Sequence, residues 1–168
     1  WGQRGNFLSV PTDCPQRDER LGWTGDAQVF VRTAAYNMDV IGFFTKWMDD
    51  VNDAQRPNGA FTNIAPDVGG LNAGIAAWAD AGVIVPWTMY LMYGDMRILE
   101  RHYTAMQRYI EFLEHESHEW LRPNQGLGDW LSVGAATPND LLATAYFAYS
   151  VSLMQRIAGV LGFDSDAE

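Results

Sequence analysis

Four carboxylates, two arginines and one tryptophan lie within the eighteen-residue stretch PTDCPQRDERLGWTGDAQ, residues 11–28. Carboxylates this close repel one another at neutral pH, unless arginines offset the repulsion, a ligand uses the charges or one carboxyl stays protonated. Cleavage of a glycosidic bond needs such groups: a carboxylic acid to protonate the leaving oxygen, carboxylates to hold hydroxyls, and an aromatic face for the sugar. A solvated loop in which Asp26 caps the following helix is the simpler alternative.

Two later segments repeat the pairing of tryptophan with a nearby aspartate. They are Trp78-Ala79-Asp80 and Gly128-Asp129-Trp130, and both lie in glycine-rich surroundings where a core tryptophan is not expected. Three segments with one chemistry favour a site over a solvated loop. By contrast, Trp47 falls on a helical stripe and Trp87 in an apolar stretch, so we expect both to pack in the core.

Metal and cofactor chemistry has little support in the sequence. His115 and His118 lie three residues apart, but no third ligand follows at a suitable spacing. Cys14 has no histidine partner nearby, so an inert thiol is expected. We therefore predict neither a metal nor a cofactor.

The composition limits the partners. The chain has 168 residues, 48% of them hydrophobic, and a net charge of -10. An acidic chain with few, scattered basic residues is a poor partner for nucleic acid or an anionic membrane surface, so neither is expected. A single cysteine excludes an internal disulfide and leaves the compartment open. The ends predict a piece of a longer protein.

Apolar spacing predicts an all-helical chain of about five helices. Residues 26–55 read as two helices or one bent helix, and further helices are expected at about 79–93, 96–117 and 137–161. Gly94-Asp95 predicts a tight turn between two of them. The segments 60–77 and 121–136 are long glycine-rich loops, which places functional residues at one rim of a helical solenoid or toroid.

The string DCPQRDERLGWTGD, from Asp13 to Asp26, resembles the signature of bacterial α-L-rhamnosidases of glycoside hydrolase family 78. The later strings WADA, PW, YGD and GDWL, which begin at residues 78, 86, 93 and 128, fit the same family in order. The resemblance covers nearly the whole chain.

The resemblance implies an (α/α)6 barrel, of which residues 1–168 form the N-terminal part, truncated at both ends. It also implies hydrolysis of terminal α-L-rhamnose with inversion, so the expected partner is a rhamnose-containing carbohydrate. Glu19 resembles the general acid, and the general base is expected to be a glutamate beyond Glu168. The residues that resemble sugar ligands and pocket walls are Asp13, Arg17, Asp26, Trp23, Trp78 and Trp130.

Asp80 and Asp129 are further candidates for the site because each is paired with a tryptophan. Two alternatives stay open: another helical-toroid glycosidase, and a non-catalytic helical carbohydrate-binding module. A part of a toroid leaves apolar helix faces without partners, so self-association is expected if these residues are produced alone.

Overall fold

The computed structural model describes residues 1–69 and 72–167, and over these residues the chain is all-helical, as predicted. The elements are α1 (Gly2–Asn6), α2 (Thr24–Asn37), α3 (Ile41–Asp53), α4 (Ala81–Tyr93), α5 (Arg97–His115), α6 (Asn139–Leu161) and a short 3-10 helix, η1 (Asp164–Asp166). Within the described ranges, β pairing is limited to isolated bridges.

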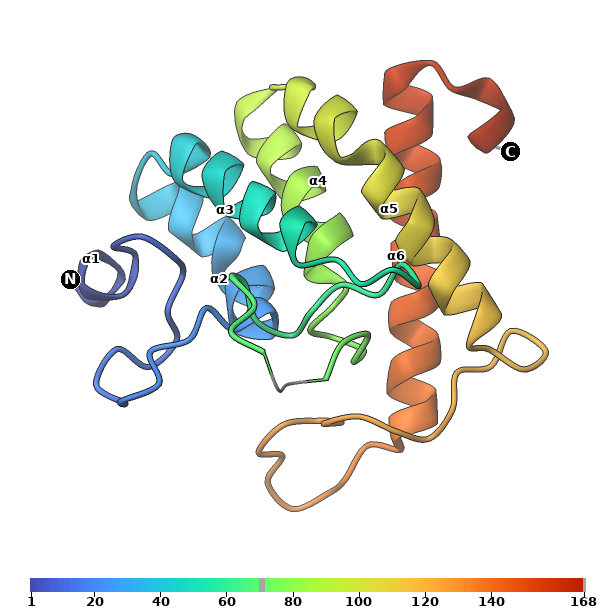
Figure 1. Cartoon of the computed structure of the whole chain (residues 1–168), viewed down its shortest axis with the longest axis horizontal. Coiled ribbons are helices and arrows are strands. Elements are labelled where there is room, and N and C mark those ends of the chain that lie inside the picture. Colours follow the sequence, from blue (N-terminus) through green and yellow to red (C-terminus); the bar gives the residue numbers. More distant parts are fainter. Residues whose placement is uncertain (70–71, 168) are drawn as a thin grey trace.

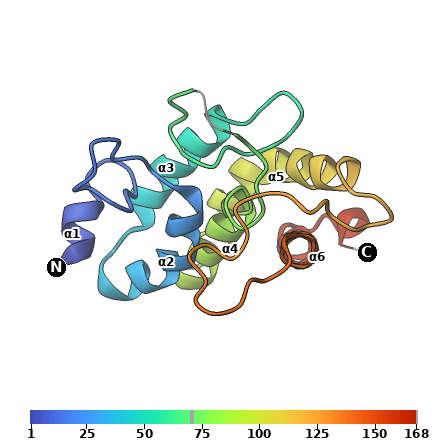
Figure 2. The same cartoon turned by 90° about the horizontal axis from the view of Figure 1, so that it is seen from below.

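The helices form two layers (Figures 1 and 2). One layer holds α2, α4 and α6, with α4 packed between the other two, and the second layer holds α3 and α5. The largest buried side chains, among them Phe44, Trp47, Met89 and Met106, belong to the core that joins these helices. Successive helices therefore alternate between the layers, as expected for hairpins of a helical toroid.

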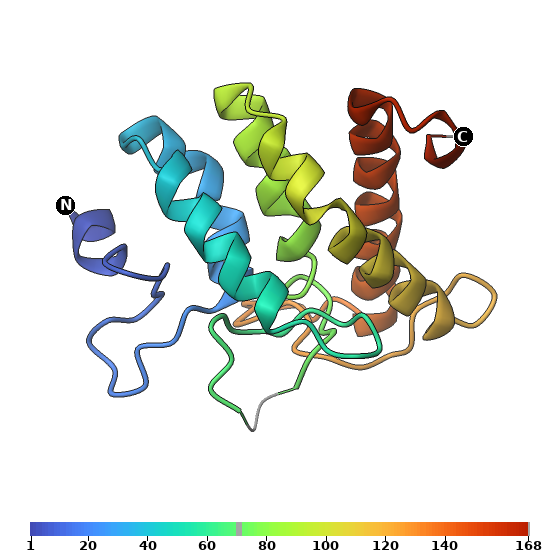
Figure 3. The same cartoon turned by 45° about the horizontal axis from the view of Figure 1, so that its top comes forward.

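All long loops lie at one end of the layers (Figure 3). The segments 7–23, 54–80 and 116–138 lead into the N-termini of α2, α4 and α6, whereas short turns at 38–40 and 94–96 close the hairpins at the other end. The positive ends of three helix dipoles thus face the loops that carry the predicted site residues. This polarity concentrates the candidate chemistry at one rim.

Helix α5 shows how the sequence specifies its elements. Its apolar stripe, which includes Leu99, Met106 and Leu113, is buried, while Glu111 and Glu114 are exposed. The preceding turn is also as predicted, because Gly94 takes a left-handed conformation and its N–H donates to the carbonyl of Tyr90 at 2.8 Å.

The structure differs from the sequence-based predictions at some points, and at others it decides between the alternatives that the sequence left open. The segment 26–55 is two helices rather than one bent helix, and the five-residue α1 was not predicted. Helix α2 begins at Thr24 after Trp23, so Asp26 lies within its first turn and does not cap it. Trp47 is fully buried, as predicted, but Trp87 is only partly buried, packed against Tyr90.

The structure does not describe three residues. They are Gly70 and Leu71, in the glycine-rich loop predicted at 60–77, and Glu168, at the C-terminus. Of the helices described, none is long and apolar enough to cross a membrane. Residues 1–69 and 72–167 contain no group of three His, Cys, Asp or Glu side chains arranged to hold a metal ion.

Candidate active site

The charged part of the 7–23 segment, called here the charged loop, is tied to the next long loop, 54–80, just before α2. Trp23 forms an isolated bridge with Ile64, and the N–H of Thr24 donates to the carbonyl of Asn63 at 3.0 Å. The hydroxyl of Thr24, which is buried, donates to the same carbonyl at 3.0 Å. These contacts fix the start of α2, and with it Asp26, relative to the loop that leads to Trp78.

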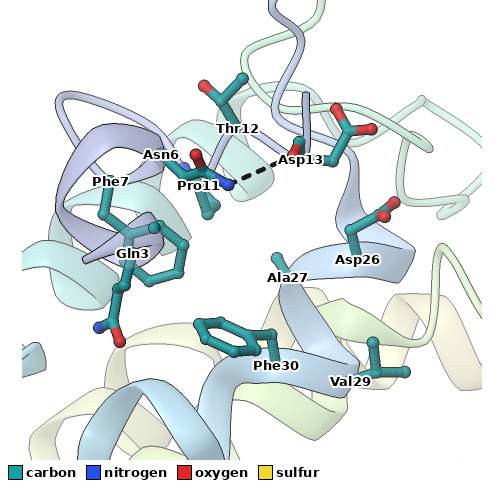
Figure 4. Close-up of a pocket in the computed structure, with 11 residues that line it drawn as sticks. Gln3, Asn6, Phe7, Pro11, Thr12, Asp13, Asp26, Ala27, Val29 and Phe30 are labelled. Atoms are coloured by element: carbon teal, nitrogen blue, oxygen red, sulfur yellow. Dashed lines mark hydrogen bonds between the residues drawn. The ribbon is translucent and has the colours of Figure 1, made fainter. Parts of the chain in front are cut away.

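Two neighbouring hollows open beside the start of α2. The first, called here the carboxylate hollow, has a volume of about 420 Å³. It is lined by Gly2, Gln3, Asn6, Phe7, Pro11, Thr12, Asp13, Asp26, Ala27, Val29 and Phe30. Figure 4 shows Asp13 and Asp26 on one side of it and the rings of Phe7 and Phe30 on another. The side chain of Asn6 donates to the backbone carbonyl of Asp13 at 3.3 Å and so holds this part of the loop.

The charge of Asp13 affects the carboxyl group of Asp26 in this hollow. Desolvation raises the pKa of Asp26, and the negative charge of Asp13 raises it further, while Arg17 opposes the shift. One Asp13 oxygen is buried and has no hydrogen-bond partner among the described residues. Such a pair is suited to accept hydrogen bonds from the hydroxyls of a polar ligand.

The second hollow, called here the aromatic hollow, has a volume of about 310 Å³. It is lined by Gly25, Asp26, Gln28, Val29, Ala77, Trp78, Gly128, Asp129, Trp130, Leu142 and Tyr146. Asp26 and Val29 line both hollows and therefore stand between them. The aromatic hollow thus brings together residues from α2, both later loops and α6.

Trp78 packs closely against Gly25 in the first turn of α2, where there is no side chain. The indole is only 8% exposed, and a Cβ built on Gly25 would lie 2.8 Å from it. Contacts that short do not occur in real structures, so only glycine allows the ring to lie against the first turn of α2. One face of the aromatic hollow is therefore set by this close approach.

The other predicted residues of the later loops differ in depth. Trp130 is 62% exposed at the mouth of the aromatic hollow, and Asp129 accepts a hydrogen bond from the hydroxyl of Thr137 at 3.1 Å. Asp80 is only 1% exposed and lies beneath the surface, outside the residues that line either hollow. Burial raises the pKa of Asp80, although hydrogen bonds from Ser150 and from the N–H of Ala77 oppose the shift.

The remaining predicted residues lie on the charged loop itself. Arg17 and Glu19 form an exposed ion pair with 3.6 Å between Nη1 and Oε1. Neither residue, nor the half-buried Trp23, is among the residues that line the two hollows. Hydrogen bonding to Asp13 raises the pKa of the Cys14 thiol, which disfavours the reactive thiolate.

The sequence did not point to every residue of these hollows. Tyr146 lies on α6, and Gln28 on α2, far along the chain from Trp78. Each sits within an ordinary helical pattern, so no local signal marked it. Asn6 and Phe7 were missed for a related reason, since α1 was not predicted.

Alternating helical hairpins, with carboxylates and aromatic rings gathered on the loops at one end, define the class of a helical-toroid carbohydrate-active domain. The family model of the bacterial alpha-L-rhamnosidase six-hairpin glycosidase domain matches residues 1–168, and the chain belongs to this family.

Relatives support the same assignment. The chain is 55% identical over 165 residues to an alpha-L-rhamnosidase of Streptomyces avermitilis, covering 98% of this chain and 16% of that protein. It is 40% identical to one from Formosa agariphila, covering 96% of this chain and 18% of that protein. The chain therefore spans less than a fifth of the length of these relatives.

Solved structures match closely. The crystal structure of Streptomyces avermitilis alpha-L-rhamnosidase complexed with L-rhamnose has a TM-score of 0.95 and 56% identity, over 96% of this chain and 16% of that chain. The alpha-L-rhamnosidase of Dictyoglumus thermophilum has a TM-score of 0.93 and 39% identity, over 99% of this chain and 19% of that chain.

Proposed function

We propose that this chain is part of the catalytic domain of an enzyme that hydrolyses terminal α-L-rhamnose from glycosides or polysaccharides. The observation that carries the proposal is the aromatic hollow, where Asp26, Trp78 and Trp130 meet from three segments of a chain of this family. A solved relative is complexed with L-rhamnose, which supports this sugar as the ligand.

The proposed mechanism inverts the configuration at the anomeric carbon. Glu19 is the general acid that protonates the leaving oxygen, and its exposed position on the charged loop leaves it free to meet a glycosidic bond. The general base is a glutamate outside these 168 residues, which activates a water on the opposite face of the sugar. In inverting enzymes the two carboxyl groups stand about 6.5–9.5 Å apart, which leaves room for that water.

The other residues bind the sugar in this proposal. Asp13 and Asp26 accept hydrogen bonds from hydroxyls at the carboxylate hollow, and Arg17 both donates to hydroxyls and pairs with Glu19. The indoles of Trp78 and Trp130 cover the apolar faces of the sugar, with Asp129 at the rim, and Trp23 adds a further aromatic face from the charged loop.

The test is to incubate the whole protein that carries these residues with an aryl α-L-rhamnoside and to follow the first product by NMR. We expect β-L-rhamnose to appear first, because inversion changes the anomeric configuration. First release of the α anomer would contradict inversion. Hydrolysis of the aryl glycoside of another sugar, without hydrolysis of the rhamnoside, would indicate a different toroid glycosidase. Rhamnose binding without hydrolysis would indicate a binding module.

A further inference from the structure

We propose that Asp80 is a positioning residue, which holds the backbone of Ala77 and so fixes the Trp78 ring in the aromatic hollow. The inference rests on the proposed function for its effect on catalysis. Asp80 is only 1% exposed, which keeps a sugar hydroxyl from reaching it.

Both oxygens of Asp80 are engaged. Oδ2 accepts the backbone N–H of Ala77 at 2.8 Å, and Oδ1 accepts the hydroxyl of Ser150, on α6, at 2.7 Å. The carboxylate therefore links the loop residue just before Trp78 to a helix seventy residues further along the chain.

Ala77 needs such support. Its φ is +68°, in the left-handed region that residues with a Cβ seldom adopt because it is strained for them. The carbonyl of Ala77 accepts a hydrogen bond from the side chain of Gln28, on α2. Asp80 thus hydrogen-bonds to the N–H, and Gln28 to the carbonyl, of the same strained residue.

The position of Ala77 determines that of Trp78. The strained residue turns the chain so that the following indole lies against Gly25 of α2, where it lines the aromatic hollow. Relaxation of Ala77 to an ordinary φ would redirect the next residue and withdraw the ring from this contact. Asp80 consequently acts on the hollow through Ala77, without touching the ligand.

The experiment compares Asp80→Ala with Asp80→Asn in the whole protein. Alanine removes both hydrogen bonds, and we expect KM for an aryl rhamnoside to rise about tenfold, the effect of a lost hydrogen bond in a binding site. Asparagine can keep both, since its oxygen accepts from Ala77 and its amide donates to the Ser150 hydroxyl. We expect Asp80→Asn to stay within about twofold of the parent. If Asn and Ala are equally impaired, Asp80 acts through its charge and the inference is wrong.

A second variant tests the route through Ala77. Glycine adopts a positive φ without steric cost, so Ala77→Gly should recover most of the KM lost in Asp80→Ala. A purely structural loss of buried contacts would not be recovered. The matched control is Asn52→Ala, which removes a 2.6 Å contact to His102 between α3 and α5, in the other layer, and should leave KM unchanged.

A third measurement does not depend on rhamnose. The near-ultraviolet circular dichroism difference between each protein and its Trp78→Phe version isolates the Trp78 signal. It should weaken in Asp80→Ala and persist in Asp80→Asn. If Asp80→Ala does not fold, Gln28→Leu should weaken the same signal, because it releases the Ala77 carbonyl. An unchanged Trp78 signal would overturn the inference, whereas a parent without rhamnosidase activity would overturn only the proposed function.

Discussion

Glu19 forms an ion pair with Arg17 on an exposed part of the charged loop. If it is the general acid, Glu19→Gln should lower kcat/KM by about 10²–10⁴-fold on a rhamnoside with a poor leaving group, because the amide cannot donate the proton. An activated aryl rhamnoside, whose leaving oxygen needs less protonation, should lose much less. Steady-state kinetics on both substrates measures the difference, and equal losses would remove Glu19 from this role.

Gly25 allows a sharper test of the aromatic hollow. In Gly25→Ala the new Cβ would lie 2.8 Å from the Trp78 ring, so the ring must move and the dissociation constant for L-rhamnose should rise at least about tenfold. Isothermal titration calorimetry of the whole protein measures this constant. Unchanged rhamnose binding would mean that Trp78 does not form part of the site.

Gly42 provides the matched control, because it is the second residue of α3 as Gly25 is of α2. A Cβ on Gly42 would meet nothing within 4 Å. Gly42→Ala should therefore leave rhamnose binding unchanged and stabilise the protein by about 0.5–1 kcal/mol, since alanine is the better helix former. Thermal unfolding of the two variants separates the helix effect from the clash.

For single residues, the sequence indicated the residue types in the site but not how deeply each is buried. Asp80 and Asp129 have the same local pattern, an aspartate near a tryptophan, yet one is buried and the other exposed. One contact that distinguishes Asp80 is its hydrogen bond with Ser150, which forms only when α6 packs beside α4. A contact across seventy residues leaves no trace in a local pattern.

Between elements, the pairing of α3 with α5 depends on a buried histidine. The side chain of Asn52 donates to Nδ1 of His102 at 2.6 Å, and Nε2 of the ring has no partner among the described residues. Burial lowers the pKa of His102 to about 4, with Asp49 opposing and Arg101 favouring the shift. A proton on Nδ1 would also replace the acceptor that Asn52 uses.

The pH dependence follows from that shift. The folded pKa of about 4 lies below the ordinary value of 6.5, so the stability from neutral His102 is complete above pH 6.5 and is lost as the pH falls toward 4. The loss amounts to about 3 kcal/mol. Urea unfolding from pH 4 to 7.5 should therefore be less pH-dependent in His102→Gln than in the parent. A pH profile for His102→Gln parallel to that of the parent would contradict the prediction.

The helices could largely be predicted, because residues close together in the sequence determine where each one begins and ends. The stripe of α5 and the Gly94 turn could be identified from spacing and turn chemistry. Helix α1 could not, because it is five residues long, contains two glycines and is fixed by contacts elsewhere. One such contact joins Gln3 to the carbonyl of Ala34 at 3.2 Å.

Among the described residues of the whole molecule, one of the two helix layers has no helix packed on its outer side. In Figure 2, α3 and α5 lie on one side of α2, α4 and α6, and no described helix lies on the other. These three helices carry large hydrophobic side chains that are exposed: Val29, Tyr36, Leu91, Leu141 and Tyr149. In a closed toroid, the corresponding surfaces would be covered by further helices.

The 168 residues produced alone should therefore self-associate and have no rhamnosidase activity. Association follows from the exposed apolar side chains, and sedimentation velocity at several concentrations would detect it. Inactivity follows because inversion needs a base opposite Glu19, and we place that base outside these residues. Incubation with an aryl α-L-rhamnoside beside a Glu19→Gln control tests the second claim. Turnover that the control abolishes would mean that a base lies within the chain, with Asp26, then Asp129, as candidates, because Asp80 is buried.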